Sequence, residues 1–189
     1  MNIDDIKNYL QEHLSEFRYN HSTRVAEEAK KIAKIYNIDE NKAYKVGLVH
    51  DVAHEFTEDE KLFYIKKYNL PNEFLEPSYS NILHSDIGAI VAKEKFLFDD
   101  DMCQAIKYHT IGNKNMNIFD KIILIADKVG RNNLDNHMQQ VKTLVYQLNL
   151  DQALIMYFEK LTDSLKERKL AMHPDSIELI DLLKENSEK

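Results

Sequence analysis

The adjacent pair His50-Asp51 is the clearest chemical signal in this chain. It lies in an apolar run, between residues 47–49 and residues 52–53. Burying a carboxylate there is costly unless a cation compensates its charge, and a neutral imidazole beside it cannot do so. Neighbouring positions of a helix diverge by about 100°, so both side chains can reach one metal ion, while the second carboxylate oxygen can bridge to another. The pair therefore predicts a metal site.

Four further side chains have a similar setting. Asp127 interrupts an apolar series, and three histidines fall within or at the end of stretches whose apolar residues recur at helical spacing. A buried imidazole needs a hydrogen-bond partner or a metal, and for any one histidine alone an ordinary partner is the preferred explanation. The mixed imidazole and carboxylate set suits iron, manganese or zinc. Two neighbouring ion sites are expected, one formed by His21, His50, Asp51 and Asp127, the other by His84 and His109.

The elements that must position these residues are predicted to be helices almost throughout. The chain contains only four Gly and three Pro, which favours long helices over many tight turns. Residues 122–125 could form a strand instead, but the apolar run around them extends to about twelve residues, which favours a buried helix. Helices are expected at about 3–10, 25–35, 43–52, 57–68, 82–96, 100–109, 118–129, 136–147 and 150–168, and after Pro174.

Caps and irregular segments mark the ends of several helices. Thr57 and Glu60 have the spacing of a capping box, and Asn117 can cap the helix that carries Asp127. Residues 69–80, with two prolines, and residues 111–117, with one glycine and three asparagines, are expected to be connections.

The chain has 189 residues, the size of one ordinary domain, and no internal repeat or linker divides it. We expect an all-α fold with a single domain over residues 1–189, a helical bundle around a buried di-metal site. The catalytic core is expected at about 18–131, with C-terminal helices at about 136–186 completing the bundle.

Composition limits the partners. A net charge of −7 argues against a nucleic-acid polymer, because tracking phosphates needs a basic surface, but it leaves a small anionic substrate open. The N-terminal residues lack the pattern of a signal peptide, and no apolar run reaches the roughly 20 residues needed to cross a bilayer. Cys103 is the single cysteine and cannot form an internal disulfide; a buried structural thiol is expected there. These features favour a cytoplasmic protein without a membrane partner.

The order of His21, His50-Asp51 and the distant Asp127 on a helical background resembles the HD-domain phosphohydrolases. Four longer segments are similar to the YqeK-type branch of that family, over nearly the whole chain. They are Arg18-Tyr19-Asn20-His21-Ser22, Leu83-His84-Ser85-Asp86-Ile87-Gly88-Ala89, Ala105-Ile106-Lys107-Tyr108-His109-Thr110-Ile111-Gly112, and Asp120-Lys121-Ile122-Ile123 leading into Ala126-Asp127.

The resemblance implies a single HD domain with two metal ions, preferentially iron, that cleaves diadenosine tetraphosphate to two ADP by attack of a metal-bound water. Older descriptions connect the branch with NAD metabolism. It also implies the two ion sites given above, with Asp51 bridging them. Hydrolysis of a nucleoside monophosphate or a cyclic nucleotide, and a non-catalytic nucleotide-binding regulator, are the alternatives. A homodimer is left open.

The sequence departs from the family at two places. The metal aspartate is usually followed by Tyr, Ile, Glu, Pro and a nearby Arg, whereas here Lys128-Val129-Gly130-Arg131 follows. The lysine usual three residues after the HD aspartate is replaced by His54, which could contact phosphate or donate a proton. We expect Asp51 and His54 to be catalytic. Substrate contacts are expected from Arg18, Lys107, Thr110, Lys128 and Arg131, although plain solvated charges are an equal alternative for the basic residues.

The remaining histidines and aromatic residues are expected to have structural roles. His13, His137 and His173 are predicted to lie on the surface. Phe63, Tyr64 and Tyr68 recur at helical spacing and are predicted to pack in the core. Tyr79 or Tyr108 could stack on an adenine.

Overall fold

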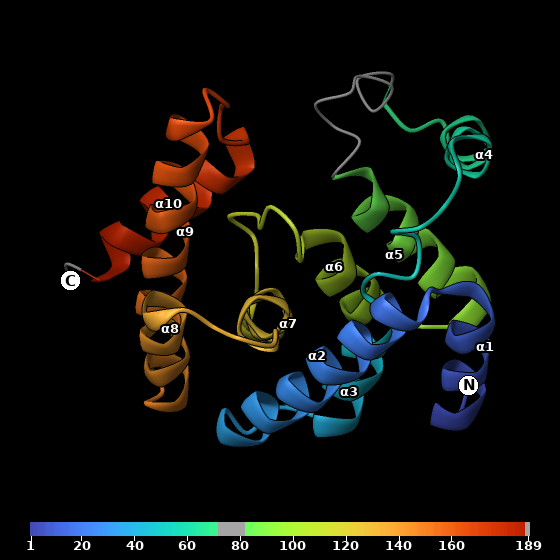
Figure 1. Ribbon diagram of the computed structural model, residues 1–189, viewed down its shortest axis with the longest axis horizontal. Coiled ribbons are helices and arrows are strands. Elements are labelled where there is room, and N and C mark those ends of the chain that lie inside the picture. The colour runs from blue at the N-terminus through green and yellow to red at the C-terminus, as the bar shows by residue number, and fades with distance from the viewer. Residues whose placement is uncertain (72–81, 188–189) are drawn as a thin grey trace.

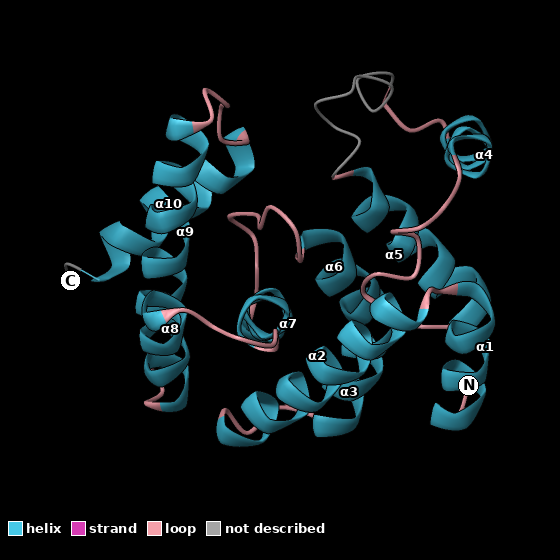
Figure 2. Cartoon of the chain, viewed as in Figure 1, coloured by secondary structure: helices cyan, strands magenta, loops and turns pink. Residues whose placement is uncertain are grey.

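The computed structural model describes residues 1–71 and 82–187. Over these residues the chain forms ten helices and no strand, which confirms the all-α prediction (Figures 1 and 2). The helices are α1 (Ile3–His13), α2 (Glu16–Ile35), α3 (Glu40–Val49), α4 (Glu58–Tyr68), α5 (Leu83–Phe96), α6 (Asp100–Tyr108), α7 (Ile118–Val129), α8 (Asn136–Tyr146), α9 (Leu150–Glu167) and α10 (Pro174–Ser187).

Side-chain caps begin helices where the sequence predicted them. Thr57 accepts a hydrogen bond from the Glu60 amide and the Glu60 carboxylate accepts one from Thr57, a complete capping box. Asn117 and Asp120 form a second one at the start of α7. These contacts satisfy amides that the first turn of a helix leaves without a partner. The α7 cap therefore fixes where the helix that carries Asp127 begins.

Helix α2 begins well before the apolar positions that predicted it. The apolar pattern indicated a helix from about residue 25, but α2 begins at Glu16, where the Ser15 hydroxyl accepts a hydrogen bond from the Arg18 amide. Its first two turns carry few apolar residues, so periodicity alone did not reveal them. His21, which was predicted to fall within or at the end of a helix, lies well inside α2.

The end of α3 is also different, and this corrects the prediction that His50-Asp51 lies within a helix. The helix ends at Val49, with His50 as its C-cap. The next amides bond three residues back rather than four, from Val52 to the Val49 carbonyl at 2.9 Å and from His54 to the Asp51 carbonyl at 2.9 Å. This turn is itself buried at residues 50–53, so its apolar residues continued the helical pattern past the true end.

Helix α7 lies at the centre of the described structure, seen nearly end-on in Figure 1. It packs against α2, α3 and α6 on one side and against α8 and α9 on the other, while α10 packs against α9. Residues 122–129 are all buried, which explains why their sequence is apolar on several faces. The Asp127 carboxylate is thereby held within the core.

Helices α2 and α3 approach each other unusually closely. A Cβ atom added at Gly47 would lie 2.6 Å from the Ala26 Cα and 2.9 Å from its amide nitrogen. Only glycine fits there without moving one of the helices. This contact sets the distance between His21 on α2 and His50 at the end of α3.

The two predicted connections have different outcomes. Residues 111–117 contain no α-helix, as predicted, and Gly112 adopts a φ of +74°. Most of the predicted irregular segment 69–80 lies outside the described residues, as does Tyr79. None of the described helices is both long and apolar enough to cross a bilayer.

Candidate metal centre

The six predicted metal ligands come together in one buried cluster. They originate from five helices or helix ends: α2, the end of α3 with the turn after it, the first turn of α5, the end of α6, and α7. Each is less than a tenth exposed. The residues are His21, His50, Asp51, His84, His109 and Asp127.

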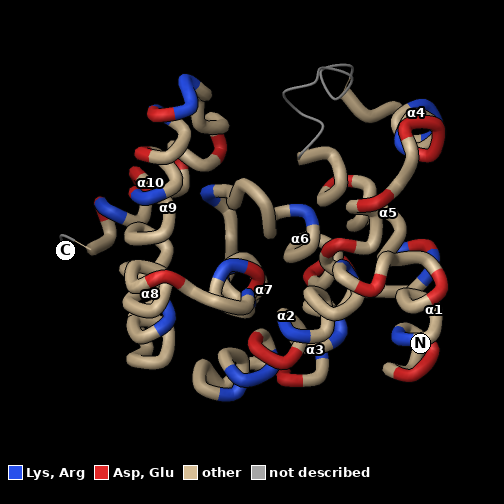
Figure 3. Tube along the Cα trace, viewed as in Figure 1, with Lys and Arg blue, Asp and Glu red and all other residues tan. Residues whose placement is uncertain are grey.

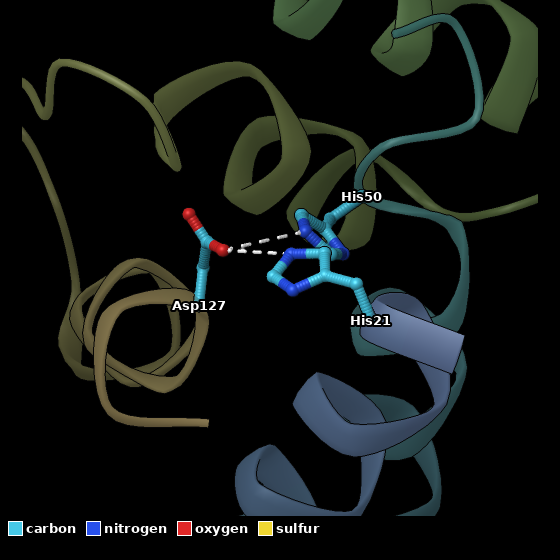
Figure 4. A group of neighbouring side chains, drawn as sticks. All are labelled: His21, His50 and Asp127. Atoms are coloured by element: carbon cyan, nitrogen blue, oxygen red, sulfur yellow. Dashed lines mark ion pairs between the residues drawn. The ribbon is translucent and has the colours of Figure 1, made fainter. Parts of the chain in front are cut away.

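The first part of the cluster faces α7. The Oδ1 atom of Asp127 lies 3.0 Å from Nε2 of His21 and 3.7 Å from Nε2 of His50. Figure 4 shows the three side chains pointing toward one another from α2, the end of α3 and α7. Two imidazole nitrogens and a carboxylate oxygen thus converge on one point, and such a donor set suits a transition-metal ion.

The Asp51 carboxylate lies between two pairs of histidines. Its Oδ2 atom is 3.5 Å from His21 Nε2 and 3.4 Å from His50 Nε2. Its Oδ1 atom is 3.4 Å from His84 Nε2 and 3.6 Å from His109 Nε2. Each carboxylate oxygen therefore faces its own imidazole pair, which is the arrangement that a bridging ligand between two ions requires.

Backbone hydrogen bonds orient two of the imidazoles. His50 donates from Nδ1 to the Gly47 carbonyl at 2.8 Å, and His109 donates from Nδ1 to the Ile106 carbonyl at 2.6 Å. In the neutral ring this leaves a lone pair on Nε2 directed into the cluster. The His50 Nε2 atom is fully buried and has no hydrogen-bond partner among the described residues. Because an unpaired buried nitrogen is costly, the site fits a metal ion that would bind it.

The electrostatics of the cluster also fit a cation. Burial acts to lower the pKa of His50, but the Asp51 and Asp127 carboxylates outweigh it and raise that pKa to about 10. Burial acts to raise the pKa of both carboxyls; His50 at Asp51 and Lys128 at Asp127 hold each pKa well below its usual range. Two ionised carboxylates are costly to bury, and a bound metal cation would compensate their charge.

His84 has the opposite electrostatic setting. Burial and the neighbouring His109 hold the pKa of His84 well below its usual value, so its ring is neutral at physiological pH. The two Nε2 atoms of these histidines lie 3.2 Å apart. Neutral imidazole is the form that binds a metal.

Three basic residues contact the cluster's carboxylates. Arg18 Nη1 lies 2.6 Å from Oδ2 of Asp51, and Lys128 Nζ lies 2.6 Å from Oδ2 of Asp127. Arg131 Nη2 lies 3.7 Å from the same Oδ2 atom of Asp127, and its Nε donates to the Asp127 main-chain carbonyl at 3.2 Å. Burial acts to lower the pKa of Lys128, but Asp127 raises it overall, so the ammonium stays charged. Arg18 and Lys128 thus orient carboxylates in addition to any contact with substrate.

The cluster opens into a cavity of about 500 Å³. Thr110 lines it, with its hydroxyl 3.3 Å from His84 Nε2 and 3.2 Å from His109 Nε2. His54 lines it too: the residue is exposed, but its ring centroid lies 4.8 Å from that of His84, and partial burial lowers the pKa of His54. Lys107, a predicted substrate contact, is not among the residues that line this cavity. Its ammonium lies 3.3 Å from Asp86 Oδ1.

Three residues of the cavity wall were not predicted: Phe17, Arg24 and Asn132. Phe17 and Arg24 stand four residues before and three residues after His21, so all three share one face of α2. A predicted start of α2 near Glu16 would have shown from the sequence that these three residues share a face. Phe17 is 73% exposed, and the Arg24 guanidinium has no hydrogen bond or ion pair to the residues that the structure describes.

The other predicted positions lie away from the cluster. His13 is exposed as predicted, whereas His137 and His173 are half-buried. Cys103 is half-buried and burial raises its pKa, in keeping with a structural thiol. The core prediction is wrong for Phe63, which is 57% exposed, whereas Tyr64 packs against the core.

Comparisons with known proteins agree with this site. The HD domain family matches residues 18–132. A symmetrical bis(5'-nucleosyl)-tetraphosphatase from Staphylococcus aureus is 31% identical over 100% of this chain and 98% of its own length. The corresponding protein from Bacillus subtilis is 28% identical over 93% of this chain and 94% of its own.

A solved structure is also similar. It comes from Clostridium acetobutylicum and is described as a predicted HD superfamily hydrolase involved in NAD metabolism. It has 31% sequence identity and a TM-score of 0.90, and the likeness covers 98% of both chains. All six residues of the cluster fall inside the matched range 18–132. The chain therefore belongs to the HD domain family of metal-dependent phosphohydrolases.

Proposed function

We propose that this chain cleaves diadenosine tetraphosphate symmetrically into two ADP molecules. The relatives from Staphylococcus aureus and Bacillus subtilis, similar over nearly their whole lengths, carry the name of that activity. The observation that carries the proposal is the position of Asp51, with one carboxylate oxygen toward His21 and His50 and the other toward His84 and His109. This arrangement supports a pair of ions beside one open cavity.

The proposed ligands of the two ions share Asp51. His21, His50 and Asp127 would hold the first ion, and His84 and His109 the second. A bound pair of transition-metal ions supplies a water of lowered pKa and disperses the charge of the transition state. We propose iron for both ions, as the resemblance to the YqeK-type branch implies. Manganese and zinc are the alternatives, because nitrogen and oxygen donors suit all three metals.

The chain's own residues bind and orient the polyphosphate. Arg131 is the proposed phosphate contact at the cavity mouth, because its side chain is 57% exposed and its guanidinium can turn toward a ligand. Arg24 is a second one, since its guanidinium is uncommitted among the described residues. Thr110 can donate its hydroxyl hydrogen to a phosphoryl oxygen on the side of His84 and His109.

His54 is proposed to handle a proton. Its ring lines the cavity beside His84, and its lowered pKa keeps it neutral at physiological pH, so it can accept and return a proton at a phosphate oxygen. Arg18 and Lys128 are proposed to position Asp51 and Asp127. Lys107, which contacts Asp86, is left as a weaker candidate for substrate binding.

The proposed partner is a small nucleotide in the cytoplasm. Basic and acidic positions are interspersed along the described chain (Figure 3), and the net charge is −7. This distribution of charged positions, with a net negative charge, does not favour tracking of a nucleic-acid backbone. A homodimer is compatible with this proposal.

The product of diadenosine tetraphosphate hydrolysis tests the proposed function. We expect ADP as the single nucleotide product, measured by anion-exchange chromatography after incubation with metal-loaded protein. ATP together with AMP would show asymmetric cleavage and contradict the proposal. Two parallel incubations test the alternative substrates, one with AMP as a nucleoside monophosphate and one with a cyclic nucleotide. We expect no hydrolysis of either.

A further inference from the structure

A second cavity adjoins the metal cavity. It has a volume of about 220 Å³ and lies between the loop after α7 and helices α8 and α9. Lys128, Arg131 and Asn132 line both cavities, so the two are continuous at these residues. The remaining residues of its wall are Asn133, Leu134, Asp135, Met138 and Tyr157. We refer to it as the side cavity.

The wall of the side cavity combines apolar and polar surfaces. Leu134, Met138 and Tyr157 are half-buried and pack against the core. The Lys128 ammonium lies over one face of the Tyr157 ring, 5.8 Å from its centroid, while the ring's hydroxyl makes no hydrogen bond to a residue in the described part of the chain. An aromatic ring with a free polar end beside a thioether is a surface on which a planar heterocycle can stack.

The polar groups of the side cavity are also available. Asn132 and Asn133 are exposed, and their side-chain amides have no hydrogen-bond partner among the described residues. Asp135, in contrast, is committed, because it caps α8 at the Met138 amide and pairs with Lys160. The two amides therefore remain to bind the hydroxyl groups of a sugar.

The residues between the two cavities define a path for a polyphosphate. Lys128 lines both cavities and is committed to Asp127, with its Nζ 2.6 Å from Oδ2. Arg131 is more than half exposed and lines both cavities, so it can bind a phosphate between them. A polyphosphate with one end at the metal cluster can thus pass Arg131, and the nucleoside at its other end can reach Tyr157.

We propose that the side cavity is a nucleoside subsite. It takes the nucleoside of one ADP half of the substrate, with the base stacked on Tyr157 beside Met138, the ribose at Asn132, and the diphosphate at Arg131. This inference rests on the proposed function, because it needs a substrate whose phosphates lie at the metal cluster. It assigns the specificity for a nucleotide over an inorganic polyphosphate to α8 and α9, which lie beyond residues 18–132, the range that the HD domain family matches.

The test compares two ligands that differ in the nucleoside. ADP and inorganic tripolyphosphate are titrated into the metal-loaded, full-length protein by calorimetry. Tyr157→Ala is expected to weaken ADP binding roughly tenfold or more, the scale of a lost base stack, and to leave tripolyphosphate binding within about twofold. Tyr157→Phe is expected to bind ADP as the wild type does. Unchanged ADP binding in Tyr157→Ala, or an equal loss for both ligands, would overturn the subsite.

A control and a second variant guard against general damage to the fold. Tyr146→Ala removes a more exposed tyrosine, which is 40% exposed on α8 and lies outside both cavities, and is expected to leave both affinities unchanged. Tyr157→Leu keeps an apolar side chain in place while removing the ring, so it is expected to fold and to show the same selective loss for ADP. Retention of wild-type ADP affinity in Tyr157→Leu would contradict stacking.

The binding test separates this inference from the proposed function. If the protein does not cleave diadenosine tetraphosphate but Tyr157→Ala selectively loses ADP binding, the function fails and the subsite stands. If the protein releases ADP from diadenosine tetraphosphate while Tyr157→Ala leaves both KM and ADP affinity unchanged, the function stands and the subsite fails.

Discussion

Each oxygen of the Asp127 carboxylate has a different neighbour. Oδ1 faces His21 and His50, and Oδ2 accepts a hydrogen bond from the buried Lys128 ammonium at 2.6 Å. The lysine thus fixes which oxygen is available to a metal, a role that hydrogen-bonded partners of metal ligands commonly have. The HD-domain family usually has tyrosine at the position of Lys128, so the sequence showed that this position is unusual. It could not show which residue the lysine contacts.

We predict that Lys128→Gln weakens metal binding. Loss of the ammonium frees the Asp127 carboxylate to rotate away from His21 and His50, and loss of this oriented ligand should lower metal affinity roughly 10- to 100-fold. Competition with a chromogenic chelator measures this affinity. Lys121→Gln is the control, because Lys121 lies on the same helix but pairs with Asp151. Equal metal affinities in the two variants would show that Lys128 does not position Asp127.

Helices α2 and α3 show what the sequence could and could not predict at the scale of elements. Apolar periodicity located both helices, and the capping pattern of Thr57 and Asn117 located two helix starts correctly. The sequence did not predict the polar first turns of α2, and it extended α3 into the buried turn at residues 50–53. Both differences arise because the spacing of apolar residues shows which side chains are buried, not which backbone hydrogen bonds form. The sequence alone indicated the residues of the metal cluster. It did not indicate that Phe17 and Arg24 share one face of α2 with His21.

The close approach at Gly47 predicts a specific effect of Gly47→Ala. The new methyl group would lie 2.6 Å from the Ala26 backbone, which cannot yield without moving α2. We expect a loss of about 1–3 kcal/mol in the free energy of unfolding, measured with urea, and weaker metal binding as His21 moves from His50.

Gly88→Ala provides the comparison for this prediction. Its added Cβ would lie 3.3 Å from the Ile106 Cγ2, a side-chain atom that can shift. The loss of stability should therefore be clearly smaller than for Gly47→Ala. A larger loss in Gly88→Ala would contradict the importance of the α2–α3 contact.

At the scale of the whole molecule, the cluster links segments that are far apart in the sequence. Its six side chains come from positions 21 to 127, and α8 and α9 cover α7 from the opposite side. A bound ion would therefore hold several helices together. We propose that residues 1–189 form one domain, with a core at about 18–131 completed by the C-terminal helices.

Removal of metal should therefore lower the stability of the whole chain. An ion present at a thousandfold excess over its Kd contributes about 4 kcal/mol, and each kcal/mol shifts Tm by about 2–4 °C in a chain of this size. We expect chelation to lower Tm by roughly 10 °C, with a single transition in calorimetry both before and after. Two separate transitions would contradict the single domain, and an unchanged Tm would contradict a structural contribution of the metal.

The central claim is that Asp51 lies between two metal ions, and the metal content of the purified protein tests it most directly. Elemental analysis by plasma mass spectrometry, after purification without added metal and again after reconstitution, should approach two transition-metal ions per chain. The same measurement on Asp51→Ala should give about one or fewer. A wild-type content below one ion per chain that does not rise on reconstitution would contradict the account.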